Sequence, residues 1–217
     1  MDITHIIYLS VLTMAALTAI VSLKKKISFP VQIIALLVLY TGVVEWSVVY
    51  KIEFMPDKTN VQMYNFFNLV QYLAFAYYFR QIIQLHFVQK IIRFFLYLYP
   101  IFWYVLVFFV FQFNEWNSYV FIVGGVFSIL WAVVYCYQLL TAEEPVMLRN
   151  CSEFWIAIGL IFFYVCSVPY MGMYRFIAEY HTDLARLLWI PLQISNIVMY
   201  SLFTYAFICQ LTNIRKS

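Results

Sequence analysis

Charged residues are scarce in this chain of 217 residues, which has 13 lysines and arginines and 10 aspartates and glutamates. Soluble globular domains carry charge on about a quarter of their residues, so a share of 11% excludes that class of protein. The net charge of +3 is too small for a surface that follows nucleic-acid phosphates, and we expect no nucleic-acid partner. Only four cysteines are present, which excludes a disulfide scaffold.

Apolar residues make up most of the chain instead: 65% are apolar and 22% are Phe, Trp or Tyr. A helix needs about 20 such residues to cross a bilayer, and seven stretches of this kind lie between polar breaks. A backbone inside lipid must form its hydrogen bonds internally, which favours helices. We therefore predict an all-α integral membrane protein, a single seven-helix transmembrane domain over residues 1–217, with spans at 3–23, 30–50, 61–85, 94–113, 118–140, 154–174 and 185–210.

Lysine and arginine are distributed unequally over the two ends of these spans. Nine lie on one side, namely Lys24, Lys25, Lys26, Arg80, Lys90, Arg93, Arg149, Arg215 and Lys216. Four lie on the other side, namely Lys51, Lys58, Arg175 and Arg186. Because cytoplasmic loops carry the excess of basic residues, we predict the N-terminus outside and the C-terminus in the cytoplasm. The lysines of the first span follow it, so we expect this span to stay uncleaved.

Similar residues recur in the third and seventh spans. Asn68 and Tyr72 are matched by Asn196 and Tyr200 at a constant offset of 128. Internal repeats of this kind occur in transporters, where related helical units meet at a substrate site. The spacing predicts a 3+1+3 parallel repeat that puts the two asparagines on equivalent helices. Coincidence, in a chain so rich in Phe and Tyr, is the alternative.

Glu45 is the one acidic residue well inside a predicted span. A carboxyl group is expensive to place in a bilayer, so it should face the bundle interior. The third and seventh spans offer polar partners at one helical spacing, namely Asn65, Asn68 and Tyr72, and Gln193, Asn196 and Tyr200. Together with Glu45 as the anchor, these residues predict a ligand-binding pocket open to the outside. The alternative is interhelical packing, in which the same groups only hydrogen-bond across helices.

Groups suited to catalysis or cofactor attachment are few. Glu45 has no second carboxylate within the spans and Cys166 has no histidine at its depth, so we predict a protein that is not an enzyme. No lysine lies in the last span, which excludes a retinal Schiff base. The three histidines show no metal-ligand spacing. We therefore expect neither a cofactor nor a metal.

Two apolar runs carry a resemblance: EFWIAIGLIFFY from Glu153 to Tyr164, and NIVMYSLFTYAFIC from Asn196 to Cys209. Over these runs the chain resembles a group of small seven-helix proteins of Bacteroidetes, commonly encoded beside sensor histidine kinases. The resemblance implies a multi-pass protein of the bacterial inner membrane with a sensory role. It also implies a membrane histidine kinase, or another signalling protein, as partner. It carries no site residues to transfer.

The layout is also similar to that of the SWEET sugar transporters, whose third and seventh spans each carry an asparagine, as Asn68 and Asn196 do here. The chain lacks the Pro-Gln signatures of that superfamily. We therefore predict a non-enzymatic, receptor-like or sensory protein in a lipid bilayer that binds an unknown small molecule. A small-solute transporter is the alternative, and a membrane-embedded lipid enzyme ranks third.

Overall fold

The computed structural model describes residues 3–25, 27–50, 60–111, 116–142, 147–180 and 182–214. Of residues 174–180, 182–188 and 213–214 only the backbone is described. These ranges form seven α-helices and no strand: α1 (Ile3–Lys24), α2 (Phe29–Val49), α3 (Val61–Ile82), α4 (His86–Val105), α5 (Ser118–Leu140), α6 (Ser152–Tyr180) and α7 (Thr182–Ile214). A π-helical turn (Leu106–Val110) continues α4, and a 3-10 turn (Leu148–Asn150) precedes α6. The all-α prediction is confirmed over the described residues.

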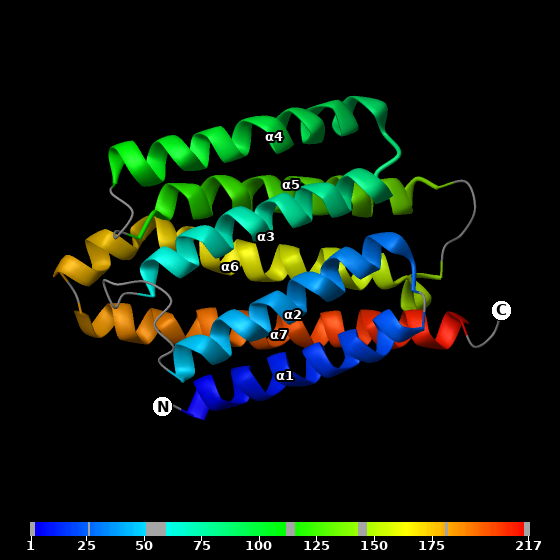
Figure 1. Cartoon of the computed structure of the whole chain (residues 1–217), viewed down its shortest axis with the longest axis horizontal. Coiled ribbons are helices and arrows are strands. Elements are labelled where there is room, and N and C mark those ends of the chain that lie inside the picture. The colour runs from blue at the N-terminus through cyan, green and yellow to red at the C-terminus, as the bar shows by residue number, and fades with distance from the viewer. Residues whose placement is uncertain are drawn as a thin grey trace.

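The helices run side by side along the long axis of the molecule, and the two chain ends lie at opposite ends of the bundle (Figure 1). The last helix, α7, packs against both α6 and the first helix, α1. Helix α4 lies at the far edge of the bundle, beyond α3 and α5 (Figure 1). Chain segments far apart in sequence therefore meet at each end of the bundle, where two groups of polar residues gather.

Six helices are long and apolar enough to cross a membrane: α1, α2, α4 with its π-helical turn, α5, α6 and α7. Large apolar side chains face outward along them, as Met14, Leu36, Phe94, Leu130 and Val165 do. An apolar exterior of this extent suits a lipid bilayer, because water would meet it at high cost. The chain is therefore compatible with a multi-pass membrane protein.

Helix α3 is the exception among the seven, and its polar residues explain why. Gln62, Asn65, Asn68 and Gln71 lower its mean hydropathy, and all four are buried within the bundle. Helix α3 contacts α2, α4 and α5. The helix that is least apolar in sequence therefore keeps its polar face away from the exterior, as bundle-interior polar residues of membrane proteins do. That α3 spans the bilayer as a seventh helix stays a prediction.

Three predicted span boundaries differ from the helices observed. Helix α4 begins at His86, eight residues before the predicted start at 94. Helices α6 and α7 have 29 and 33 residues and continue through most of the stretch 175–184, which was predicted as a connection. Charged residues in these stretches end the apolar run but not the helix, since long basic side chains at a helix end reach out to the polar interface. Hydropathy thus located the apolar part of these three helices and underestimated their length.

A cluster of aromatic rings fills the middle of the bundle around Tyr72. We call Tyr72, Phe75, Tyr99, Phe121 and Tyr164 the aromatic layer; their ring centroids lie 5.7 to 6.5 Å from that of Tyr72. The Tyr72 hydroxyl donates to the Phe121 carbonyl oxygen at 3.0 Å. Such ring pairs add about 0.5–1.5 kcal/mol each beyond their buried area. The layer therefore ties α3, α4, α5 and α6 together.

Two glycines of α5 allow the rings of the aromatic layer to pack closely against this helix. A Cβ at Gly124 would collide with the Tyr72 ring, and one at Gly125 would come within 2.8 Å of the Tyr164 ring. Small residues at such crossings allow helix backbones to approach closely. The adjacent glycines are thus a packing requirement of the aromatic layer.

Candidate functional site

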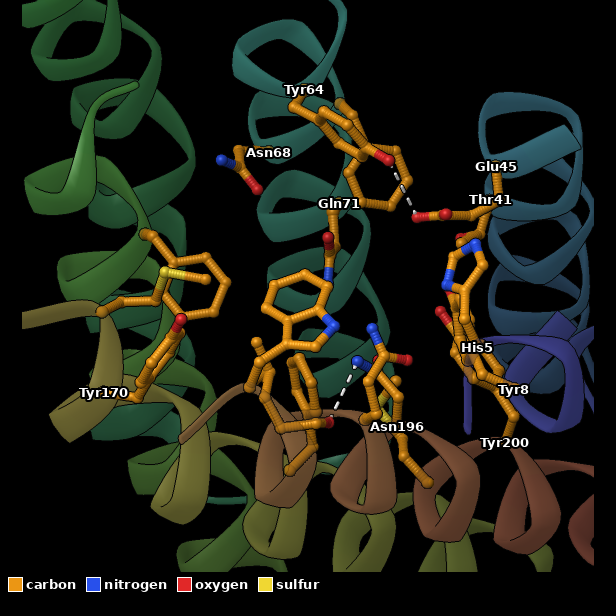
Figure 2. A pocket seen from close by; sticks show the side chains of 18 of the residues that line it. His5, Tyr8, Thr41, Glu45, Tyr64, Asn68, Gln71, Tyr170, Asn196 and Tyr200 are labelled. Atoms are coloured by element: carbon orange, nitrogen blue, oxygen red, sulfur yellow. Dashed lines mark hydrogen bonds between the residues drawn. The ribbon is translucent and has the colours of Figure 1, made fainter. Parts of the chain in front are cut away.

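A cavity of about 390 Å³ lies at the end of the bundle that holds the N-terminus, between the aromatic layer and the bundle surface. Side chains from α1, α2, α3, α6 and α7 line it, together with Trp116, which precedes α5, and Phe121 of α5. The volume falls in the range of about 300–1,000 Å³ that is typical of small-molecule sites. Figure 2 shows these side chains converging on one space. We call it the Glu45 cavity.

Glu45 projects into this cavity from α2, and tyrosines are its neighbours (Figure 2). The Tyr64 hydroxyl donates to Glu45 Oε1 at 3.4 Å. The Tyr8 hydroxyl is also hydrogen-bonded to this carboxyl group, and the Tyr200 hydroxyl lies within electrostatic reach of it. The rings of Tyr8 and Tyr200 contact each other at a centroid distance of 6.1 Å. Three helices, α1, α3 and α7, therefore each bring one tyrosine to the carboxyl group.

The walls of the cavity carry amides from α3 and α7. Gln71 donates through Nε2 to the Tyr164 hydroxyl at 2.8 Å, which ties the cavity floor to the aromatic layer. Asn196 donates through Nδ2 to the Leu192 carbonyl oxygen at 3.2 Å (Figure 2). Asn68 and Gln193 are each 3% exposed and also line the cavity. Buried amides of this kind demand partners, since an unmade hydrogen bond costs about 1–3 kcal/mol.

Three buried polar atoms at the cavity have no hydrogen-bond partner among the described residues. They are Asn68 Nδ2, Gln193 Oε1 and Trp116 Nε1. Two of them are donors and one is an acceptor, and the residues that carry them come from separate elements. Unpartnered polar groups that converge on one cavity are typical of a binding site, where a ligand or water completes the hydrogen bonds.

The structure brings together five of the seven residues predicted for the pocket: Glu45, Asn68, Gln193, Asn196 and Tyr200. Asn65 and Tyr72 do not line it. Asn65 is buried, and its backbone carbonyl oxygen accepts a hydrogen bond from Trp103 Nε1 of α4 at 2.8 Å. Tyr72 is fully buried in the aromatic layer. These two residues therefore belong to the packing of α3 and not to the proposed site.

The expected hydrogen bonds between Glu45 and the amides are also not found, because Tyr64 occupies that role. In Figure 2, Glu45 and Asn68 lie on opposite sides of the cavity. The sequence reasoning missed Tyr8, Tyr64 and Gln71. Tyr64, Asn68 and Gln71 are spaced i, i+4 and i+7, so a search along this face of α3 that included its first turn would have found two of them. Nothing comparable in the sequence points to Tyr8.

The chemistry of the cavity favours binding over catalysis. Glu45 is the single carboxylate, and no lysine or arginine occurs, among its described lining residues. His5 also lines the cavity, but no hydrogen bond joins these two described side chains. Within the part of the chain that the structure describes, no three His, Cys, Asp or Glu residues are grouped as a metal site. That the protein is not an enzyme stays a prediction.

A second polar cluster lies at the opposite end of the bundle, and we call it the Glu153 network. Glu153, at the start of α6, accepts from Ser152 Oγ at 2.8 Å and from Ser28 Oγ at 3.4 Å. Gln210 of α7 donates to Ser152 Oγ at 2.7 Å, to Ser28 Oγ at 3.2 Å and to Glu153 Oε1 at 3.4 Å. None of these four residues has a buried side-chain atom that lacks a hydrogen-bond partner among the described residues. The network therefore joins the ends of α2, α6 and α7.

Comparison with known proteins gives no further indication of function: no protein-family model, no curated protein sequence and no solved structure matches the chain.

Proposed function

We propose that this chain is a non-enzymatic, receptor-like or sensory membrane protein that binds a small molecule in the Glu45 cavity and signals through a separate partner. The observation that supports this most is that three residues lining one cavity, Asn68, Gln193 and Trp116, each carry a buried polar atom without a partner among the described residues. In the Glu153 network, by contrast, the buried polar groups hydrogen-bond to one another. The cavity therefore suits an additional molecule.

In the proposed orientation, the N-terminal end of the bundle faces the outside of a bacterial inner membrane and the C-terminus lies in the cytoplasm. All six lysine and arginine side chains that the structure describes belong to helix ends or turns at the other end of the bundle from the cavity, namely Lys24, Lys25, Arg80, Lys90, Arg93 and Arg149. Because basic residues favour the cytoplasmic side, the Glu45 cavity would face outward. A reporter fused after Ser217, or inserted within residues 141–153, should report cytoplasm. A periplasmic signal at either place contradicts this orientation.

The aromatic layer favours a receptor over a conduit. Tyr72, Phe75 and Tyr164 are at most 1% exposed and pack directly beneath the cavity. A ligand that reaches Gln71 thus meets a packed floor, linked to it by the Gln71–Tyr164 hydrogen bond. A small shift of this floor would reach α4, α5 and α6 through their ring contacts, and a partner such as a membrane histidine kinase would sense the movement of those helices.

Purification from native membranes tests the role. We expect a histidine kinase to copurify with the tagged chain, and its autophosphorylation to change when Asn196→Phe fills the cavity. The matched control is Ile194→Phe, since Ile194 lies on the same helix, is 48% exposed and faces away from the cavity. A kinase that does not copurify, or whose activity is equal in the Asn196→Phe and Ile194→Phe variants, contradicts the proposal.

A small-solute transporter is the second candidate, because Asn68 and Asn196 both line the one cavity. A parallel repeat would place its two equivalent asparagines together in this way. Proteoliposomes that take up labelled mono- or disaccharides, and lose this uptake in Asn68→Ala and Asn196→Ala, would replace the receptor proposal with this one. A lipid enzyme has no such observation in its favour.

A further inference from the structure

We propose that the ligand of the Glu45 cavity is a small organic cation with an alkylated ammonium group, held by the Glu45 carboxylate and the surrounding aromatic rings. This inference rests on the proposed function only in taking the cavity as a ligand site. It names the chemical class of the ligand, which neither the receptor proposal nor the transporter alternative specifies.

The first reason to expect a cationic ligand is the lack of a counter-charge for the Glu45 carboxylate. A carboxylate away from water needs a counter-charge or several strong hydrogen bonds. Glu45 is hydrogen-bonded to two tyrosine hydroxyls, that of Tyr64 at the long distance of 3.4 Å and that of Tyr8, and neither of them carries a counter-charge. No lysine or arginine is among the described residues that line the cavity, and His5 is the single basic side chain there. A cationic ligand would supply the counter-charge that the described lining residues do not.

The aromatic lining carries the second step. Phe, Tyr and Trp make up nine of the twenty lining residues, and they come from every element that borders the cavity except α2. Beside Glu45 stand Tyr8, Tyr64 and Tyr200, while Trp116 meets the Tyr64 ring edge-on at a centroid distance of 6.2 Å. Alkylated ammonium groups bind to the faces of Trp and Tyr rings, and aromatic cages of this composition are a common way to recognise them. Anionic or strongly hydrated ligands have no such complement here.

The amides carry the third step, which concerns the rest of the ligand. Asn68 Nδ2 and Gln193 Oε1 are buried without a partner among the described residues, and both residues line the cavity. Asn68 lies across the cavity from Glu45 (Figure 2). A hydroxyl or carbonyl group at the other end of the cation would satisfy one or both of them. The inferred ligand is therefore bifunctional, with an ammonium group at Glu45 and an oxygen function toward Asn68 and Gln193.

Calorimetry on the purified full chain tests this with choline and its neutral isostere, 3,3-dimethylbutan-1-ol, which has the same shape and hydroxyl but no charge. We expect choline to bind at least tenfold more tightly than the isostere. Glu45→Gln should weaken choline binding at least tenfold and leave the isostere unchanged. Glu153→Gln is the matched control, because it makes the same change at the other end of the bundle, and it should leave both affinities unchanged.

The possible outcomes separate this inference from the proposed function. Absence of saturable choline binding, equal binding of the two probes, or an unaltered choline affinity in Glu45→Gln each overturns the cation proposal and leaves the kinase test standing. Choline affinity unaffected by Asn196→Phe overturns the cavity as the site, and the proposed function falls with it.

Two sources could supply the ammonium group, a free solute or a lipid headgroup. Nanodiscs of phosphatidylcholine and of phosphatidylglycerol distinguish them. A choline affinity equal in both lipids supports a free solute. A choline affinity at least tenfold weaker in phosphatidylcholine supports a headgroup that occupies the same site.

Discussion

The two ends of this bundle contain the same kinds of polar side chains, but these side chains differ in how completely they are hydrogen-bonded. At one end, Glu153 accepts hydrogen bonds on both carboxyl oxygens, and Gln210 reaches three acceptors within 3.4 Å. At the other end, Glu45 is hydrogen-bonded to the hydroxyls of Tyr64, at 3.4 Å, and Tyr8, and the amides of Asn68 and Gln193 are incompletely bonded. A carboxylate and amides thus form interhelical contacts at one end and border a cavity at the other.

This difference shows that a polar residue in an apolar bundle is not by itself evidence of a site. Glu153 and Gln210 are as unusual in composition as Glu45 and Asn68, yet their hydrogen bonds close on each other and on Ser28 and Ser152. What distinguishes the Glu45 cavity is unmet hydrogen-bonding capacity beside open space. Substitutions at either end of the bundle, or in the aromatic layer between the two ends, test this difference.

Gly124→Ala is expected to have the largest effect, because it disrupts the aromatic layer that separates the two ends. The new Cβ would collide with the Tyr72 ring, which is fully buried and held by the bond from its hydroxyl to Phe121. Overpacking of this kind lowers the free energy of unfolding by about 1–3 kcal/mol. Because the Tyr72 ring has little room to move aside, we expect a loss of about 3 kcal/mol. Thermal unfolding in detergent should show a clearly lowered melting temperature.

Gly42→Ala is the control for that substitution. Its Cβ would meet only the Ala16 Cβ, at 3.9 Å, which is ordinary contact. Alanine is the better helix former, so the melting temperature should stay equal or rise. Equal losses in the two variants would mean that glycine matters for helix flexibility and not for the approach of Tyr72.

Gln210→Leu is expected to have the second-largest effect on stability. Leucine keeps much of the volume but removes the donor that joins Ser28, Ser152 and Glu153. Ser152 is 1% exposed and would lose its shortest partner, which costs about 1–3 kcal/mol. The melting temperature should fall while choline affinity stays unchanged, since the change lies at the far end of the bundle. A loss of binding without a loss of stability would reverse the roles assigned to the two ends.

The sequence was informative about helices and about one face of each, for physical reasons. Apolar runs specify where a chain must be helical in lipid, so the all-α prediction succeeded, and Glu45, Asn68 and Asn196 reached the same cavity because helical spacing fixes which residues share a face. The partner of Glu45 was not predictable in this way. Whether Tyr64 or Asn68 meets the carboxyl group depends on the rotation of α3 relative to α2, which packing against α4 and α5 decides.

The same limit explains the two misplaced residues. Asn65 and Tyr72 lie on the polar face of α3 by spacing, yet that face is wide enough to meet α4 and α5 as well as the cavity. The Glu153 network was missed for another reason. Its members, Ser28, Ser152 and Gln210, are separated by more than fifty residues and are ordinary at helix ends, so only the fold shows that they meet.

Glu45→Leu is expected to alter stability less than Gln210→Leu does. It removes the hydrogen bonds with Tyr64 and Tyr8 and also the cost of a buried carboxyl group that has no counter-charge from lysine or arginine among the described lining residues, and these two effects oppose each other. The net change should be within about 1 kcal/mol, whereas choline affinity should fall at least as far as in Glu45→Gln. Glu45→Gln itself should unfold as the unmodified chain does. A melting temperature lowered in Glu45→Leu as much as in Gln210→Leu would make Glu45 an interhelical contact, and the contrast between the two ends would fail.

Tyr64→Phe is expected to have the smallest effect on stability, and it sharpens the contrast with a single oxygen atom. The lost hydroxyl donates to Glu45 across 3.4 Å in a cavity, and interhelical hydrogen bonds in membranes average about 0.6 kcal/mol. Ser152→Ala removes one hydroxyl donor to a carboxylate at the other end, where the distance is 2.8 Å and the serine is buried. Melting temperatures measured side by side should fall more for Ser152→Ala than for Tyr64→Phe.

The effects of these two substitutions on choline binding should follow the reverse order. The phenylalanine ring retains its face for an ammonium group, so Tyr64→Phe should change choline affinity by only a fewfold, and Ser152→Ala should not change it. If Tyr64→Phe destabilises the chain more than Ser152→Ala, the Tyr64–Glu45 bond is structural, and unmet hydrogen-bonding capacity no longer separates the cavity from the network.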